Sequence, residues 1–149
     1  MTTQEIFKKL PFSSPYLFVD ELFYVNEKGA SGCYTFHENL HFFEGHFNNF
    51  PVVPGAILIE TMAQIGGASV SIYLTSLDEH KKHNEVSVAT SYNVEFYKPV
   101  YPNEKVTVTS EVIYFRFGKL KSKVVMFNAK DEKVCEGIIS GILANKSSL

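Results

Sequence analysis

The feature that most constrains this chain is one apolar segment, residues 54–77, with a single carboxylate near its start. Apart from Glu60 the segment carries no charged side chain, and Ile, Leu, Met, Val and Ala fill most of its positions. Its length predicts one helix of roughly 24 residues, about 36 Å long. Because one packing face cannot hide a helix that is apolar nearly all round, the rest of the chain must wrap around it.

Most of the remaining chain is predicted to form strands, because apolar and polar residues alternate there. Two such segments precede the helix, and four follow a charged break, "DEHKKHNE". The predicted strands are residues 16–25, 29–36, 86–97, 105–115, 120–129 and 134–143. The sequence therefore predicts an α+β fold, in which a curved antiparallel sheet of about six strands wraps around one long central helix.

Three further segments complete this organisation. Thr2 and Glu5 have the spacing of a capping box, which opens a short N-terminal helix. Residues 37–53 lack a period and are rich in turn formers, which predicts a loop, and residues 146–149 are expected to form a frayed tail. Neither repeats nor linker-like runs divide the chain, so residues 1–149 are predicted to form a single domain.

Composition narrows the class of partner. The chain has 14 Lys and Arg against 16 Asp and Glu, a formal charge of −2. Nucleic-acid binding needs a concentrated basic face, so this balance argues against a nucleic-acid partner. The basic clusters at residues 8–9, 81–82 and 119–123 are most simply solvated surface, although one of them could meet an acidic partner.

The sequence carries no signal that we would associate with export or membrane insertion. The N-terminus lacks a basic region followed by an apolar run. The apolar stretch at residues 51–74 is interrupted by Glu60, Gln64 and three glycines, which argues against a membrane span. Cys33 and Cys135 are too isolated for a disulfide framework or a zinc site, and we expect them as free thiols packed in strands. A cytoplasmic protein is therefore expected.

Glu60 belongs to a narrow stripe along the predicted helix. Polar or small side chains recur on one face at i, i+4, i+7 and i+11, namely Glu60, Gln64, Gly67 and Ser71. The simpler interpretation is a stripe where the helix meets solvent. The sharper one is a semi-buried carboxylate at the floor of a cleft, held by Gln64. Burial raises the pKa of a carboxyl group, so such a group can donate a proton near neutral pH.

His46 is the candidate partner of Glu60. It lies in the loop among aromatic residues, just before the turn that opens the helix. A lone histidine there is more often structural, but the adjoining helix N-terminus favours a catalytic interpretation. The N–H groups of Gly55 and Ala56 lack intrahelical acceptors and can face an anionic oxygen. Gly55 also has no side chain to obstruct a substrate carbonyl. A base, an acid and an oxyanion site are therefore predicted within one short stretch.

The other histidines, His37, His41, His80 and His83, are weaker candidates. His80 and His83 lie in the charged break, where a surface role is expected. The spacing of His, Cys and Asp does not indicate a metal site, so we expect neither a metal nor a cofactor.

The stretch "FFEGHF", followed by "PVVPGAILIETMAQ", resembles the motif of the hotdog-fold (3R)-hydroxyacyl-acyl carrier protein dehydratases of bacterial type II fatty-acid synthesis. The likeness extends over nearly the whole chain, including "LPFSSPYLFVDEL", "FYKPVYPNEKV" and "VCEGIISGIL". It implies a single hotdog domain that dehydrates (3R)-hydroxyacyl-acyl carrier protein to the trans-2-enoyl product, in fatty-acid or related polyene biosynthesis. The substrate would arrive on the phosphopantetheine arm of the carrier protein.

The resemblance also implies roles for individual residues. His46 matches the catalytic histidine and Glu60 the catalytic carboxylate of the family. Gly55 matches the helix-start amide that binds the thioester carbonyl, and Gln64 matches the residue that steadies the carboxylate. In this family the active sites lie between the subunits of a homodimer, with the histidine and the carboxylate from different subunits, so a monomer would have no complete site. The acyl group runs along a tunnel beside the central helix. The sequence leaves open whether such dimers assemble further into a trimer of dimers. A glutamate at position 60 matches the plain dehydratases better than the isomerase-dehydratases.

Two departures from the family pattern affect turns. Asn48-Asn49-Phe50 replaces the middle of the family's Gly-His-Phe-Pro-Gly-x-Pro, and Asn103 replaces the glycine of its Pro-x-Pro-Gly-Asp. Asparagine can adopt the left-handed conformation that glycine would, so the turns are expected to survive. The departures suggest a divergent member that serves a specialised acyl or polyene pathway.

Two alternatives stay open on the sequence. An acyl thioesterase of the same fold could use the cleft to activate water, and would release a free acid and a thiol. A non-catalytic dimer could bind acyl carrier protein without turnover, although an idle site has no reason to keep a semi-buried acid such as Glu60. Because the carrier protein is acidic in this family, a basic rim is expected at the tunnel mouth. Its candidate is Lys98, with Lys119, Lys121 and Lys123 as weaker ones.

Overall fold

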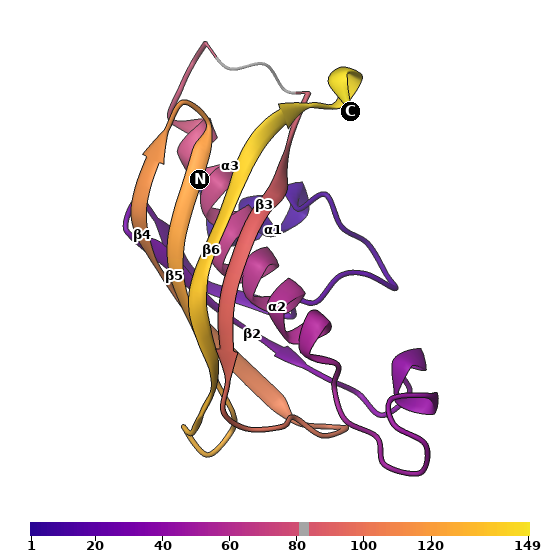
Figure 1. The fold of residues 1–149 in the computed structure, drawn as a ribbon. Coiled ribbons are helices and arrows are strands. Elements are labelled where there is room, and N and C mark those ends of the chain that lie inside the picture. Colours follow the sequence, from indigo (N-terminus) through magenta and orange to yellow (C-terminus); the bar gives the residue numbers. More distant parts are fainter. Residues whose placement is uncertain (81–83) are drawn as a thin grey trace.

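Six antiparallel strands form one curved sheet, and a long helix lies against it (Figure 1). The computed structural model describes residues 1–80 and 84–149. The strands are β1 (Glu21–Asn26), β2 (Gly29–Thr35), β3 (Glu85–Phe96), β4 (Lys105–Arg116), β5 (Lys119–Phe127) and β6 (Lys133–Asn145). They lie in the order β1-β2-β4-β5-β6-β3, and every neighbouring pair is antiparallel. The predicted α+β hotdog fold is confirmed.

The central helix is continuous but not uniform. It consists of α2 (Gly55–Ala63), a π-helical turn (Gln64–Ala68) and α3 (Ser69–Ser76). Its extent confirms the prediction of one helix over residues 54–77, but the π-helical turn was not foreseen. Gly66 lies in this turn so close to the sheet that a Cβ atom there would stand 2.9 Å from Cβ of Ser110. The helix is long and apolar enough to cross a membrane, yet it is the core helix of this fold.

The core lies between this helix and the sheet. Its fully buried side chains include Met62 and Ile65 from the helix and Val108, Val124 and Met126 from the strands. A helix that is apolar on most sides is thereby removed from water, which is the main favourable contribution to folding.

The N-terminal helix α1 (Thr3–Lys9) has the predicted capping box. Oγ1 of Thr2 accepts the N–H of Glu5 at 3.1 Å, and Oε2 of Glu5 accepts the N–H of Thr2 at 2.7 Å. Two local predictions need correction. The predicted loop 37–53 contains a 3₁₀ turn at His41–Glu44, and the C-terminal residues Lys146–Ser148 form another, capped by the side chain of Asn145, rather than a frayed tail.

The first predicted strand is shorter than expected. It begins at Glu21, not at residue 16. The backbone of residues 16–18 is bound instead by the side chain of Gln64, which donates to the carbonyl oxygen of Tyr16 at 2.9 Å and accepts the N–H of Phe18 at 2.8 Å. The side chain of Gln64, on the central helix, therefore supplies the backbone hydrogen bonds that a neighbouring strand would have made with residues 16 and 18.

The turns that carry asparagine instead of glycine adopt the expected conformation. Asn49 has φ 57° and Asn103 has φ 69°, both in the left-handed region. Asn103 is fixed further, because its N–H donates to the carbonyl oxygen of Phe36 at 2.6 Å and its Oδ1 accepts the N–H of Glu38 at 3.0 Å. The substitutions thus preserve the backbone geometry that glycine would supply.

Both cysteines are free and buried in strands, as predicted. Cys33 lies in β2 and Cys135 in β6, where Sγ of Cys135 is 3.7 Å from Sδ of Met62. Desolvation in this packed position raises the pKa of Cys135 to about 12. The Cys135 thiol therefore stays protonated and unreactive at neutral pH.

Candidate active site

Glu60 is held by a buried amide one helical turn away. Gln64 is fully buried, and its Nε2 donates to Oε1 of Glu60 at 3.0 Å. The same side chain binds the backbone at Tyr16 and Phe18, so its orientation is fixed from three directions. The predicted contact between Gln64 and a partly buried carboxylate is therefore present.

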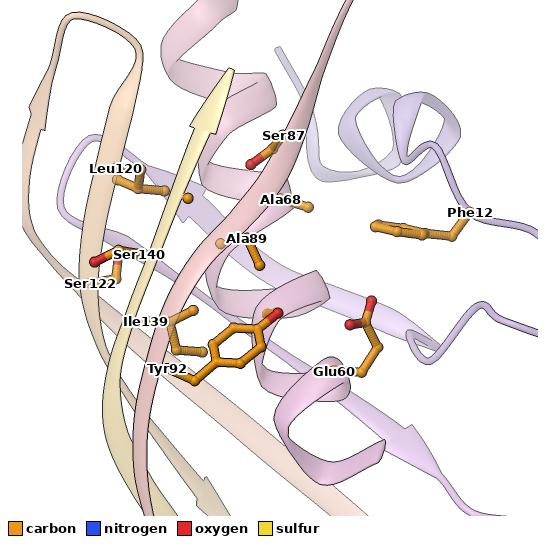
Figure 2. A pocket seen from close by; sticks show the side chains of 13 residues that line it. Phe12, Glu60, Ala68, Ser87, Ala89, Tyr92, Leu120, Ser122, Ile139 and Ser140 are labelled. Carbon is orange, nitrogen blue, oxygen red and sulfur yellow. The ribbon is translucent and has the colours of Figure 1, made fainter. Parts of the chain in front are cut away.

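Glu60 faces a cavity of about 120 Å³ between the central helix and the sheet (Figure 2). Ala63, Gly67 and Ala68 line the helix side, and Tyr92, Leu120 and Ile139 line the sheet side. Most of the wall is apolar, with a few polar groups placed on it, as is usual for a small-molecule site. The polar stripe therefore borders this cavity at Glu60 and Gly67, while both residues keep part of their surface exposed.

Two tyrosines near Glu60 were missed by the sequence analysis. Desolvation, and after it the negative charge of Glu60, raises the pKa of Tyr92 and also that of Tyr16. The ring of Tyr92 projects from β3 with its hydroxyl on the side of Glu60 (Figure 2). Both phenols therefore remain neutral hydrogen-bond donors beside the carboxylate. In the sequence, Tyr92 differs from its neighbours only as an aromatic residue among polar ones in a predicted strand, and this pattern does not by itself indicate a site.

His46 is partly buried and has a defined tautomer. Its Nδ1 lies 2.9 Å from the carbonyl oxygen of Val52. Because a carbonyl oxygen can only accept, Nδ1 carries the proton and Nε2 of the neutral ring is left as a base. The imidazole also stacks on the ring of Phe47, with 4.0 Å between the ring centroids. The contacts with Val52 and Phe47 thus fix the orientation of the His46 ring and leave Nε2 without a partner among the described residues.

Within one chain, His46 and Glu60 do not share the cavity. His46 is absent from the cavity wall, and no hydrogen bond joins it to Glu60 in the part of the chain that the structure describes. The structure therefore brings Gln64 to Glu60, as predicted, but does not bring His46 to them in a single protomer.

The start of α2 offers two free amides. Pro54 occupies the N-cap, and the N–H groups of Gly55 and Ala56 have no acceptor among the described residues. The structure adds a reason for glycine at position 55. A Cβ atom there would lie 3.1 Å from Cζ of Phe96, the last residue of β3. The Phe96 ring therefore already occupies the space that a side chain at position 55 would need. Ala56 is exposed.

The candidate carrier-binding lysines differ in their surroundings. Lys98 forms an ion pair with Glu132, so its charge is partly neutralised. Lys119, Lys121 and Lys123 alternate with the buried Leu120 and Ser122 of β5, which places these lysines on the outer face of the sheet, away from the central helix. None of the three lines the cavity beside Glu60.

The weaker histidine candidates stay apart from this site. His37, His41 and His80 are exposed, whereas His83 and the pair Lys81-Lys82 lie outside the described residues. Over residues 1–80 and 84–149, His, Cys, Asp and Glu form no cluster that could hold a metal ion.

Comparison with known proteins identifies the family. The FabA-like domain matches residues 10–139 of this chain. The chain is 37% identical to the 3-hydroxyacyl-[acyl-carrier-protein] dehydratase FabZ of Geotalea uraniireducens, over 79% of this chain and 80% of the relative. It is 32% identical to the FabZ of Lawsonia intracellularis, over 97% and 94% of the two chains. The protein therefore belongs to the FabA-like family, together with these dehydratases.

Solved structures agree on the fold. The dehydratase heterocomplex ApeI:P from Xenorhabdus doucetiae superimposes with a TM-score of 0.76 at 13% identity, covering 95% of this chain and 92% of that chain. A thioesterase from Haemophilus influenzae superimposes with a TM-score of 0.70, also at 13% identity, covering 97% and 92%. At this identity the likeness shows the hotdog fold alone.

Proposed function

We propose that this protein removes water from a (3R)-hydroxyacyl group on acyl carrier protein and forms the trans-2-enoyl thioester. The observation that carries this proposal is Glu60, fixed by the buried Gln64 on the wall of a largely apolar cavity. Membership of the FabA-like family and the names of the relatives support the same reaction. The alternatives, a thioesterase and a non-catalytic carrier-binding dimer, are less well supported, because the two relatives compared above are named as dehydratases.

In the proposed mechanism, Nε2 of neutral His46 removes the C2 proton, which the neighbouring thioester makes acidic. Negative charge then develops on the thioester oxygen, where the free N–H of Gly55 and the positive end of the helix stabilise it. Glu60 gives a proton to the C3 hydroxyl as the C–O bond breaks and water leaves. The balance is one proton taken by His46 and one released by Glu60, and neither a metal nor a cofactor takes part.

We propose further that the active unit is a homodimer. Strand β3 lies at the edge of the sheet, and among residues 1–80 and 84–149 its hydrogen-bonded neighbour is β6. Three aromatic side chains at or just after this strand, Tyr92, Phe96 and Tyr97, are 41%, 47% and 49% exposed. A second copy that pairs with this edge would cover them. In the proposed dimer His46 of one protomer meets Glu60 of its partner, as the resemblance to the family implies. The mass in solution distinguishes this homodimer from a trimer of dimers.

The proposed setting is a soluble, cytoplasmic enzyme that meets its substrate on the acyl carrier protein. Lys98 was the candidate for contact with the acidic carrier protein. Because Lys98 is already paired with Glu132, we expect it to contribute less to carrier binding than an unpaired lysine would. Because the carrier is acidic, its affinity for the protein should fall as salt is added.

The decisive assay uses a short enoyl thioester on acyl carrier protein. Loss of the conjugated double bond, as water adds, is followed by absorbance, while released thiol is measured in parallel. Loss of absorbance without thiol, abolished in His46→Ala, supports the proposal. Thiol release would instead indicate a thioesterase, and silence in both signals with tight carrier binding would indicate the non-catalytic dimer.

A further inference from the structure

Two oxygen atoms on the wall of the cavity beside Glu60 have unused capacity for hydrogen bonds. Oε1 of Glu60 accepts from Gln64, but Oε2 of Glu60 has no hydrogen-bond partner among residues 1–80 and 84–149. The phenolic oxygen of Tyr92 likewise makes no hydrogen bond within the described part of the chain. Glu60 is partly buried and Tyr92 is 41% exposed, so a molecule in the cavity can reach both side chains.

The two groups belong to opposite sides of this cavity. Glu60 projects from α2 in the central helix, whereas Tyr92 projects from β3 with its hydroxyl on the side of Glu60 (Figure 2). After desolvation, the negative charge of Glu60 is the main cause that raises the pKa of Tyr92. The Tyr92 phenol therefore stays protonated at neutral pH and can donate its hydrogen. Since no hydrogen bond joins these two described side chains, each is free to bind a third group.

The other polar side chains of this wall are three serines, Ser87, Ser122 and Ser140. Ser122 and Ser140 are buried, and Oγ of Ser122 is covered so completely that a molecule in the cavity cannot contact it. Most of the remaining wall is apolar. Tyr92 is therefore the exposed hydroxyl donor that the sheet offers on the side of Glu60.

A hydroxyl group of a ligand suits this pair of side chains. Its oxygen has two lone pairs, so it can accept one hydrogen from protonated Glu60 and a second from Tyr92. In the proposed reaction, the group that receives the proton of Glu60 is the C3 hydroxyl of the acyl chain. Negative charge develops on this oxygen as the C3–O bond breaks, and a second donor stabilises it until the proton has moved. Tyr92 keeps its own proton, so the proton balance between Glu60 and His46 is unchanged.

We propose that Tyr92 is a further catalytic residue, whose hydroxyl donates a hydrogen bond to the C3 oxygen that leaves as water. The inference rests on the proposed dehydration and adds one residue to it. In the proposed dimer the second copy packs on the exposed part of the Tyr92 ring, whereas the hydroxyl stays on the side of Glu60. Tyr16, which also lies within the influence of the Glu60 charge, is not on the wall of this cavity and has no such role.

The first test measures binding without turnover. In a His46→Ala protein, calorimetry compares a 3-hydroxyacyl chain with the saturated chain of equal length, each as a thioester on acyl carrier protein. Tyr92→Phe in this background removes one hydroxyl and keeps the ring. Affinity for the hydroxylated chain should fall by about threefold to tenfold, and affinity for the saturated chain should stay the same. Tyr24→Phe is the matched control, because Tyr24 is similarly exposed, at 44%, and lies in β1 at the other edge of the sheet.

The second test measures turnover with His46 intact. Tyr92→Phe should lower the kcat of dehydration by about tenfold or more, because the hydrogen bond strengthens as the C3–O bond breaks. Tyr24→Phe should leave kcat at the wild-type value. Circular dichroism and the mass in solution verify that each variant is folded and assembled like the wild-type protein.

Unchanged binding and an unchanged kcat in Tyr92→Phe would overturn the inference while the dehydration stands. An equal loss of affinity for the hydroxylated and the saturated chain would also overturn it, because the hydroxyl of Tyr92 would then not recognise the C3 oxygen. If the wild-type protein dehydrates no 3-hydroxyacyl thioester, the proposed function fails, and the catalytic role of Tyr92 fails with it. The calorimetric comparison then decides separately whether Tyr92 binds a hydroxyl group at C3.

Discussion

Nε2 of Gln64 lies 3.0 Å from Oε1 of Glu60, and the same amide group binds the backbone at Tyr16 and Phe18. This one buried side chain therefore connects the candidate catalytic carboxylate to the segment that precedes β1. A change at Gln64 should affect stability and catalysis together.

Gln64→Met keeps the length of the side chain but removes its hydrogen bonds. We expect the free energy of unfolding to fall by about 1–3 kcal/mol, because the N–H of Phe18 is left buried without a partner. The kcat should fall as well, since Glu60 loses the group that orients it. Thr61→Val is the control, because within the described part of the chain this buried hydroxyl has one hydrogen bond, to the carbonyl oxygen of Ile57 in its own helix. Denaturant unfolding and the enoyl-thioester assay measure both effects, and a Gln64→Met protein with normal stability and kcat would refute the coupling.

Mixing two inactive variants tests the shared site. His46→Ala and Glu60→Gln should each lower kcat by about 10²–10⁴-fold without unfolding the protein. If each site takes His46 from one protomer and Glu60 from its partner, a mixed dimer contains one intact site. Random exchange of protomers should then restore about a quarter of the wild-type rate.

Circular dichroism and solution mass of each variant serve as the controls in that experiment. A mixture that stays inactive after verified exchange would place both residues in the same protomer's site, contrary to the proposed dimer.

Gly55→Ala distinguishes two reasons for glycine at the helix start. The added Cβ would meet the ring of Phe96 at 3.1 Å, so the strand or helix must shift and activity should fall about tenfold or more. If the ring is the obstacle, Phe96→Leu combined with Gly55→Ala should recover most of that loss. A double variant that remains as slow as Gly55→Ala would show that the substrate itself needs the space.

Gly66 and Gly67 form a matched pair for stability. A Cβ at Gly66 would stand 2.9 Å from Cβ of Ser110 and 3.1 Å from Cγ1 of Val124, whereas at Gly67 nothing lies within 4 Å. Gly66→Ala should therefore destabilise the protein by about 1–3 kcal/mol. Gly67→Ala should be neutral or stabilise by up to about 1 kcal/mol, because alanine is the better helix former. Thermal unfolding of both variants checks the pair, and equal effects would contradict the described packing.

The buried thiol of Cys135 predicts a loss of stability in alkali. Burial raises its pKa to about 12 in the folded protein, above the ordinary value of 9. The stabilising contribution is therefore complete below about pH 9 and is lost as the pH rises toward 12, by up to about 1.4 kcal/mol per pH unit. Cys135→Ala should remove this component from the pH dependence of denaturant unfolding between pH 8 and pH 11. An unchanged slope would show that other groups, such as the tyrosines, account for the loss.

Much of the fold could be predicted because its signals are local. The apolar run at residues 54–77 predicted the central helix, and the turn residues between the strands predicted the succession of strands along the chain, but not their order in the sheet. The stripe from Glu60 to Ser71 also located the cleft, since helical spacing alone places these side chains on one face. Asn49 and Asn103 were interpreted correctly for the same reason, because a left-handed turn depends on the residue that occupies it.

Other parts of the site depend on contacts between distant residues. Gln64 binds Tyr16 and Phe18, which are 48 and 46 residues away, and these bonds shortened the first predicted strand. The packing of Phe96 over Gly55 and the approach of Tyr92 to Glu60 arise only when β3 lies beside the helix. The spacing of residues within one segment cannot predict such contacts between segments that are far apart in the sequence. Local patterns also could not show that His46 lies off the cavity wall of its own chain; only the resemblance to the family implied it, by placing the histidine and the carboxylate in different subunits.

Strand β3 contributes Tyr92 and Ser87 to the wall of the cavity beside Glu60 and also lies at an edge of the sheet. In the proposed dimer, self-association and the shape of this cavity would therefore depend on the same twelve residues. During divergence from a common ancestor, a substitution that alters how two copies meet would also alter which chains fit. Differences in substrate choice between related proteins should accordingly be concentrated among the residues of β3.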